Sequence, residues 1–345
     1  MKYVKLGKSG LKVSQMCLGT WHMPRSDRLD EHSVRTVDKE EFSKVVKIAI
    51  DRGLNFFDTA NRYHGAMTPV DEAHRGNAEK VLGEALRGYD RESLVISTKV
   101  GSEMKPWPNG SGLSRKHIMW QIRESLSRLQ MDYVDVYLMH SPDPETPLRE
   151  TLWAMSDLVS SGRIHYIGCS NYEPEQIDDF MHLASELSWH GLHAPVTLQE
   201  GYNLLSREIE TRLVPTARHH ELAIMAYSPL AEGMLSEKYL SGAIPRGSRA
   251  TYSEGVRKRI TEDRLAIVRE LSAFAREKGM SLPRLALTWV ISKQESLGVT
   301  IIPIVGASSS NQLADDLEAL DVKLTSEDMT AVERMAAKLS ESDSL

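Results

Sequence analysis

Short apolar segments alternate with longer segments of helical periodicity along most of the chain. In the longer segments apolar residues recur every three or four positions, which predicts helices over 41–52, 75–88, 114–129, 147–161, 174–187, 207–219 and 264–292. The short segments have the length of buried strands and lie at 16–20, 54–58, 94–99, 135–140, 164–170, 196–199, 222–228 and 300–306. Such alternation is typical of a parallel sheet built from repeated βα units.

The number of βα units indicates how the sheet is arranged. Eight strands followed by helices favour a closed (β/α)8 TIM barrel, with extra helices, as a single domain over 1–345. Ahead of the first barrel strand, two short alternating runs flank Lys8, Ser9 and Gly10 and predict a β-hairpin. The alternative is an open doubly wound sheet, which usually carries GxGxxG after its first strand. Here that strand is followed by WHMPRSDRLD, which contains no glycine.

The long connections predict where ligands bind. The segments 21–40, 62–74, 101–113 and 228–262 all follow predicted strands. In a TIM barrel the connections that follow strands gather at one face, where the active site forms. We therefore expect a functional site at this face.

Charge and composition narrow the classes of partner. The 42 Lys and Arg residues and 48 Asp and Glu residues give a net charge of -6, with no long basic run, so nucleic acid is not expected as a partner. No segment has 18 consecutive apolar residues and no signal peptide is evident, so we expect a cytoplasmic protein without membrane contact. Cys17 and Cys169 are the two cysteines, and both are predicted to be buried thiols. A small molecule is the expected partner, and the sequence predicts no oligomeric state.

Three successive predicted strands each have a polar residue at the carboxyl end. Asp58, Lys99 and His140 end these strands, and Tyr63 follows Asp58 by five residues. Taken singly, each has a structural explanation, such as a turn former, a buried ion pair or a core histidine. Strand ends of a barrel converge on one opening, however, so we expect the four side chains to lie together.

The chemistry of these four residues suits carbonyl reduction. A carboxylate at Asp58 would keep Lys99 charged, and the ammonium would lower the pKa of Tyr63 from about 10 toward working pH. Tyr63 could then give a proton to a developing alkoxide, while a neutral His140 orients the carbonyl. This set offers neither a strong nucleophile nor a metal cage, so we expect the hydride to come from a nicotinamide cofactor.

Several motifs resemble those of the aldo-keto reductase superfamily. They are GLNFFDTANRYHG at 53–65, STK at 97–99, LMHSPD at 138–143 and GCSNY at 168–172, together with LGKSGLKVS in the opening hairpin. The resemblance spans nearly the whole chain and implies an NAD(P)H-dependent reductase of aldehydes or ketones on a (β/α)8 barrel. It also implies that Asp58, Tyr63, Lys99 and His140 form a catalytic tetrad in which Tyr63 is the proton donor.

The resemblance also implies a set of cofactor-binding residues. Those matching the nicotinamide site are Ser170, Asn171 and Gln199 for the carboxamide and Tyr227 for stacking on the ring. Those matching the diphosphate site are Ser228, Pro229, Leu230 and Gly233, with added charge from Lys238 and Arg249. Those matching the adenosine site are Gly306, Ser308, Gln312, Asp315 and Asp316.

Two departures from the family pattern bear on the choice of cofactor. Ser308 stands where Arg or Lys often binds the 2′-phosphate, and Asp315 with Asp316 replaces a frequent Glu-Asn pair. A hydroxyl can still bond to phosphate, whereas two acids nearby oppose it. NADP(H) is favoured, and NAD(H) is the alternative.

The substrate is predicted more coarsely. Trp21, His22 and Trp107 lie in loops after strands and are candidates for the substrate wall. The polar first loop favours a sugar or a short hydroxyaldehyde, and the same site would serve oxidation of a sugar or polyol.

Two rivals come from other classes of protein. One is a channel β-subunit-like binding protein, disfavoured because no long segment precedes the hairpin. The other is a barrel metal hydrolase, disfavoured because the 12 histidines form no HxH pair, so no metal site is expected.

Overall fold

The computed structural model describes residues 1–66, 71–245 and 248–342. Eight parallel strands close into a barrel, in which the last strand pairs with the first through Ile304 beside Cys17 and Val305 beside Leu18. The strands are β3 (Cys17–Gly19), β6 (Phe56–Asp58), β7 (Val95–Val100), β8 (Val134–Met139), β9 (Ile164–Ser170), β10 (Thr197–Gly201), β11 (Ala223–Tyr227) and β12 (Ile301–Val305). The predicted TIM barrel and its strands are confirmed.

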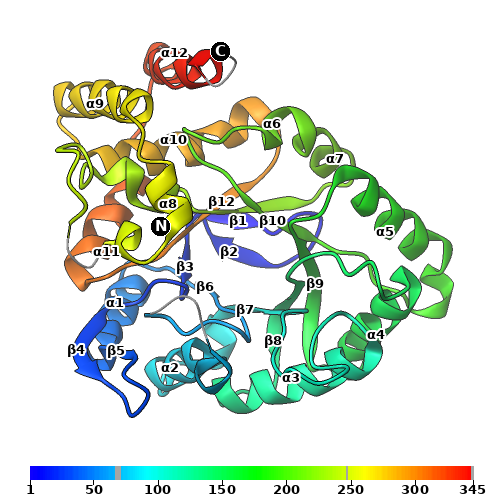
Figure 1. Cartoon of the computed structure of the whole chain (residues 1–345). Coiled ribbons are helices and arrows are strands. Elements are labelled where there is room, and N and C mark those ends of the chain that lie inside the picture. The colour runs from blue at the N-terminus through cyan, green and yellow to red at the C-terminus, as the bar shows by residue number, and fades with distance from the viewer. Residues whose placement is uncertain (67–70, 246–247, 343–345) are drawn as a thin grey trace.

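Helices surround the barrel (Figure 1). They are α1 (Lys39–Asp51), α2 (Asn77–Leu86), α3 (Arg115–Leu129), α4 (Leu148–Ser160), α5 (Pro174–Glu186), α6 (Ile209–Arg212), α7 (Val214–His219), α8 (Glu254–Lys258), α9 (Glu262–Glu277), α10 (Leu282–Leu297), α11 (Ser310–Leu317) and α12 (Ser326–Ser342). Their apolar faces pack on the outer faces of the strands in one large core. The barrel strands are therefore covered on both sides, which explains their continuous apolar runs. Within the described residues, no helix has both the length and the apolar character to cross a bilayer.

Two predicted helices are each divided in the structure. The segment 264–292 contains most of α9 and most of α10, which are separated at Gly279, where φ is +71°. Ser281 then caps α10 by accepting a hydrogen bond from the backbone of Arg284. The segment 207–219 is divided at Leu213, and Pro215 lies in the first turn of α7. Local backbone signals thus override the continuous apolar periodicity.

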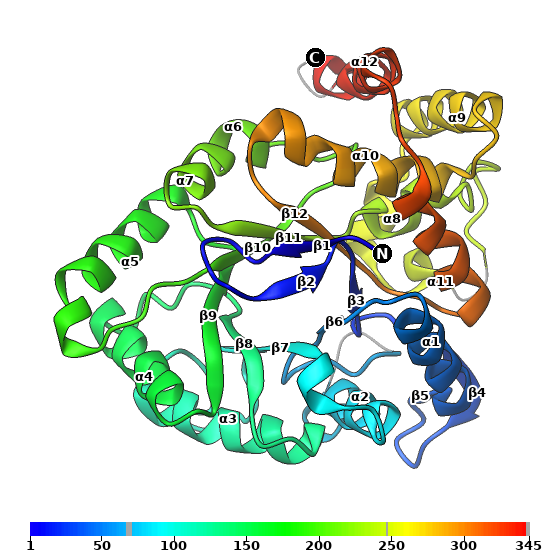
Figure 2. The same ribbon diagram turned by 180° about the vertical axis from the view of Figure 1, so that it is seen from behind.

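Two hairpins flank the barrel. The predicted amino-terminal hairpin is confirmed as β1 (Tyr3–Lys5) and β2 (Lys12–Ser14) and lies across the end of the barrel opposite the long loops (Figure 2). Its Leu6 and Val13 join the apolar cluster inside the barrel. The first long loop contains a hairpin that was not predicted, β4 (Arg25–Leu29) and β5 (Arg35–Val37).

The hairpin at the barrel end approaches the barrel backbone closely. Gly7 has φ of +59°, and a Cβ placed there would lie 2.2 Å from the carbonyl oxygen of Val196 and 2.8 Å from that of Glu221. Only glycine permits both this conformation and this proximity. The amino-terminal opening of the barrel is therefore closed by a tightly packed plug.

Candidate active site

Strand ends and one fixed turn bring the four predicted tetrad residues together. Asp58 ends β6, Lys99 lies in β7, and His140 follows β8, where its backbone N–H donates to the Val100 carbonyl at 2.8 Å. Tyr63 lies in the turn after β6, where its N–H donates to the carbonyl of Ala60 at 3.1 Å. The predicted convergence of these side chains is therefore present in the structure.

Asp58 and Lys99 form a buried ion pair. Lys99 Nζ donates to Asp58 Oδ2 at 2.6 Å and to the Thr59 carbonyl at 2.8 Å. The other carboxylate oxygen, Asp58 Oδ1, accepts from Ser97 Oγ at 2.7 Å and from Gln199 Nε2 at 3.0 Å. Burial lowers the pKa of Lys99, but the charges and hydrogen bonds of Asp58 and Tyr63 outweigh it, so the pKa is raised. The lysine is therefore a charged ammonium at neutral pH.

Tyr63 lies over this ammonium among aromatic rings. Lys99 Nζ is 4.8 Å from the centroid of the Tyr63 ring, and the ring makes edge contacts with Trp21 and His140 at centroid distances of 4.7 and 5.7 Å. Burial raises the pKa of Tyr63, and the lowering effect of Lys99 does not cancel it. The predicted fall of this pKa is therefore wrong. The effect of burial on the pKa of Tyr63 is larger than the effect of the Lys99 charge, so the phenol is fully protonated at neutral pH.

His140 is held neutral. Burial lowers its pKa well below the usual value, and the charges of Lys99 and Arg62 add to the effect. Its Nδ1 lies 3.4 Å from Ser102 Oγ. A neutral imidazole beside a protonated phenol gives two groups able to donate hydrogen bonds to one carbonyl oxygen.

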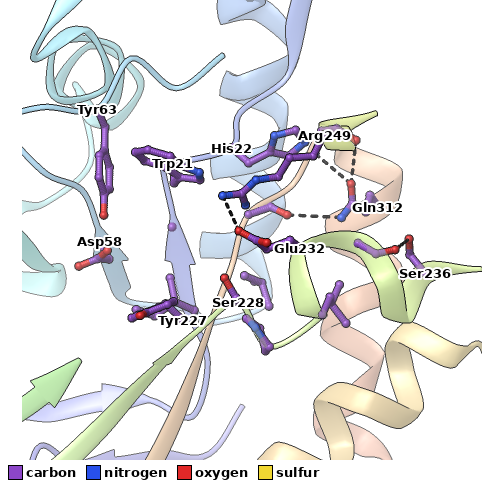
Figure 3. Close-up of a pocket in the computed structure, with 18 of the residues that line it drawn as sticks. Trp21, His22, Asp58, Tyr63, Tyr227, Ser228, Glu232, Ser236, Arg249 and Gln312 are labelled. Atoms are coloured by element: carbon purple, nitrogen blue, oxygen red, sulfur yellow. Dashed lines mark hydrogen bonds and ion pairs between the residues drawn. The ribbon is translucent and has the colours of Figure 1, made fainter. Parts of the chain in front are cut away.

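A cavity of about 770 Å³ runs from the tetrad to the start of α11 (Figure 3). Asp58, Tyr63 and His140 line it, and Lys99 lies beneath them, fully buried. The predicted binding residues on its wall are Trp21, His22, Ser170, Asn171, Gln199, Tyr227, Ser228, Pro229, Leu230, Gly233, Lys238, Arg249, Gly306, Ser308 and Gln312. Residues from seven strand ends and their loops thus share one space.

The tetrad end of the cavity presents an aromatic face and amides. Tyr227 is 36% exposed, and its ring lies where a Cβ on Gly201 would approach it to 3.1 Å. The Tyr227 hydroxyl donates to Asn171 Oδ1 at 2.9 Å, and Asn171 Nδ2 donates to the His140 carbonyl at 2.9 Å. Asn171 has φ of +62°, which turns the chain at the end of β9. A flat aromatic ring with an amide group could face this surface.

The other end of the cavity is cationic. Arg25, Lys238 and Arg249 line it, and burial together with these three charges lowers the pKa of His22 to about 3. Burial also lowers the pKa of Lys238 and of Arg249. Three cations brought this close together could hold phosphate groups.

Three of the predicted cofactor- and substrate-binding residues do not line the cavity. Trp107 is 54% exposed and stacks on Trp120, with ring centroids 6.3 Å apart. Asp315 bonds to Arg284 at 2.7 Å and to Ser281 at 2.9 Å. Asp316 is buried behind Gln312, and burial raises the pKa of its carboxyl to about 7. The structure thus brings neither aspartate to the cavity wall and leaves Trp107 outside it.

Other residues on the wall were not predicted. They are Gly19, Arg25, Arg62, Glu232, Ser236, Pro245, Ser248, Ile304 and Val305. Glu232 pairs with Arg249 at 2.8 Å and also with Arg259, which fixes part of the long loop after β11. Arg25 and Arg62 could have been flagged, because both follow barrel strands in loops that face the opening. Among the described residues, no three His, Cys, Asp or Glu side chains are grouped to hold a metal ion.

Comparisons with known proteins give the family. The model of the Aldo/keto reductase family matches residues 15–337. The chain is 36% identical to a probable voltage-gated potassium channel subunit beta of Arabidopsis thaliana, over 93% of this chain and 92% of that protein. It is 34% identical to L-glyceraldehyde 3-phosphate reductase of Escherichia coli K12, over 93% of this chain and 88% of that enzyme. The chain therefore belongs to the aldo/keto reductase family, a family of oxidoreductases built on this barrel.

Proposed function

We propose that this protein reduces a small hydroxylated or sugar-like aldehyde or ketone to an alcohol, with NADP(H) as the hydride carrier and Tyr63 as the proton donor. One observation carries the proposal. A buried Asp58–Lys99 pair lies directly beneath the Tyr63 phenol, at the floor of a long cavity. A structural ion pair alone would not require a phenol and a neutral imidazole above it.

Each residue of the tetrad has a defined task in this reaction. Tyr63 holds a proton at its hydroxyl and gives it to the carbonyl oxygen as negative charge develops there. Lys99 then stabilises the resulting phenolate, and Asp58 keeps Lys99 charged. Neutral His140 donates a second hydrogen bond that orients the carbonyl. The raised pKa of Tyr63 suits this role, since the acid keeps its proton until the alkoxide forms.

The cavity fits a nicotinamide dinucleotide. When bound, such a cofactor supplies the hydride that reduces the carbonyl carbon. Tyr227 would stack on its ring, with Ser170, Asn171 and Gln199 at its carboxamide. Lys238, Arg249 and Arg25 would hold its phosphates. The cavity is elongated and cationic at the end away from the tetrad, as a dinucleotide requires.

NADP(H) is favoured over NAD(H). From the sequence, Asp315 and Asp316 argue against binding of a 2′-phosphate. In the structure these two side chains contribute less negative charge to the cavity than expected. Asp315 is paired with Arg284, and the pKa of Asp316 is raised to about 7 by burial. Lys238 and Ser308, in contrast, both line the cavity.

A small polar carbonyl compound suits the space beside the tetrad. Trp21 packs against Tyr63 and narrows this end of the cavity, while His22 continues the same wall. The similar enzyme named L-glyceraldehyde 3-phosphate reductase supports a short hydroxyaldehyde as the substrate. The same residues would serve oxidation of a sugar or polyol, because proton transfer by Tyr63 is reversible.

The test is a panel of aldehydes, ketoses and aldoses assayed with both cofactors in both directions, with Tyr63→Phe beside the wild type. We expect Tyr63→Phe to lower kcat by about 100- to 10,000-fold, because the proton donor is lost. Fluorescence titration should give a cofactor Kd within about 2-fold of the wild type, since no charge changes. Full turnover by the variant would refute the role of Tyr63.

A second candidate function is a binding role of the kind named in the channel subunit relatives. It is favoured by the 36% identity to the Arabidopsis protein, which is similar to the identity shared with the reductase. Turnover separates the two functions. Cofactor binding without measurable reduction of any carbonyl compound in the panel would favour the binding role.

A further inference from the structure

Arg62 lies immediately before Tyr63 in a turn whose backbone is fixed from below. The backbone N–H of Asn61 donates to the carbonyl of Lys99 at 3.4 Å. The buried side chain of Asn61 donates to Gln121 Oε1 at 3.0 Å. Because this turn is anchored, Arg62 is held on the cavity wall with Tyr63 and His140.

The charges around the tetrad leave the positive charge of Arg62 uncompensated. Asp58 is neutralised by Lys99, the imidazole of His140 is neutral, and the phenol of Tyr63 is protonated. Within the described parts of the chain, Arg62 has no carboxylate within ion-pair distance, whereas Arg249 is paired with Glu232 at 2.8 Å. A solvated arginine at the mouth of the cavity is therefore free to bind an anion.

An anion bound by Arg62 need not be a phosphate group of the cofactor. Lys238, Arg249 and Arg25 already supply cations for phosphates at the opposite end. Figure 3 shows Arg249 on the far side of Trp21 from Tyr63. Arg62, in contrast, lines the cavity with Tyr63 and His140, and its positive charge is close enough to lower the pKa of both side chains. Its guanidinium can reach a group only a few bonds from a carbonyl held by Tyr63.

We propose that Arg62 binds an oxyanion, a phosphate or a carboxylate, on the short-chain aldehyde that this enzyme reduces, and that it makes anionic aldehydes preferred over neutral ones. The planar guanidinium fork matches both oxyanions with two parallel hydrogen bonds. This inference rests on the proposed reductase function and specifies its substrate class.

The experiment compares matched aldehydes in the full-length enzyme with NADPH. The pairs are succinic semialdehyde with butanal, and glyceraldehyde 3-phosphate with glyceraldehyde. We expect Arg62→Gln to lower the ratio of kcat/KM for the anionic to the neutral member by about 10- to 100-fold, since a charge-assisted pair is lost. Arg62→Lys should restore part of this ratio because it restores the charge without the fork. The first pair reports on a carboxylate and the second on a phosphate.

The matched control is Arg123→Gln, an exposed arginine of α3 away from the cavity. It changes the net charge equally and should leave both ratios within about 2-fold, as expected of a remote surface charge. An equal fall of the ratio in Arg123→Gln would assign the effect to net charge and overturn the proposal. Equal fold losses for both members of a pair in Arg62→Gln would also overturn it.

A binding measurement separates this inference from the reductase function. Titration calorimetry of 3-phosphoglycerate into the NADP⁺-saturated protein should give a Kd about 10-fold weaker in Arg62→Gln. Reduction of neutral aldehydes without any anionic preference would refute the role of Arg62 alone. If no aldehyde is reduced, the reductase function fails, and equal Kd values would then refute the anion site independently.

Discussion

The buried Asp58–Lys99 pair makes stability depend on charge in a measurable way. In Asp58→Asn, the fully buried ammonium of Lys99 loses its carboxylate but keeps the hydrogen bond to the carbonyl of Thr59. Removing one partner of a buried pair typically costs about 3–5 kcal/mol, because the remaining charge is left uncompensated. We expect a loss of that size in the free energy of unfolding at pH 7.

The pH dependence of this loss has a definite sign. In the wild type, the folded pKa of Lys99 is raised, so its contribution is fully present below about pH 10 and is lost only above it. In Asp58→Asn, burial dominates and the folded pKa falls below the unfolded value. Stability of the variant should then rise with pH by up to about 1.4 kcal/mol per pH unit, so its deficit narrows from pH 7 to pH 9.

Urea denaturation of the wild type, Asp58→Asn and Asp58→Asn/Lys99→Met at several pH values measures these differences. The double variant buries no charge, so it should be more stable than Asp58→Asn at pH 7 and should lack the narrowing with pH. A deficit below about 1 kcal/mol, or one that is constant from pH 7 to pH 9, would refute the description of Lys99 as a buried ammonium held by Asp58.

Further predictions concern the cofactor and the packing of helices. Wild type should bind NADPH at least a few-fold more tightly than NADH, and Lys238→Met should weaken NADPH binding by about 10-fold and NADH binding less. Fluorescence titration tests this, with exposed Lys323→Met as control, and equal losses for both cofactors would contradict it. In α2, a Cβ on Gly83 would lie 2.3 Å from the carbonyl oxygen of Leu129, so Gly83→Ala should lose about 1–3 kcal/mol of unfolding free energy. Gly255→Ala in α8 meets no atom within 4 Å and should be neutral or stabilising. A stable Gly83→Ala would show that α2 and α3 can move apart.

The fold was predictable because a closed parallel barrel requires local patterns of apolar and polar residues that can be recognised in the sequence. Continuous apolar runs mark strands covered on both sides, and the polar residues at the end of β6 and next to the end of β7 mark the open rim. The division of 264–292 was missed because Leu282 and its neighbours continue the helical periodicity across Gly279. The hairpin β4 and β5 was missed because its burial is slight, so no apolar alternation identifies it.

The pKa shifts and ion-pair partners of the site residues were less predictable than the identity of those residues. The direction of the Tyr63 pKa shift depends on the balance between burial and the Lys99 charge, and no sequence pattern gives that balance. Asp315 turns to Arg284, and this partner lies 31 residues away in the chain. Arg62 is adjacent to the proton donor in the sequence, but its lack of an acidic partner is a property of the folded chain.

The hairpin that plugs the amino-terminal end of the barrel separates two tasks within one molecule. Leu6, Val13 and Gly7 close the core at that end, so the barrel does not depend on the opposite rim for its closure. Substitutions in the rim loops can therefore accumulate without opening the interior to water. Duplicated genes could diverge toward new substrates by changing residues such as Arg62, while inheriting the sealed end unchanged.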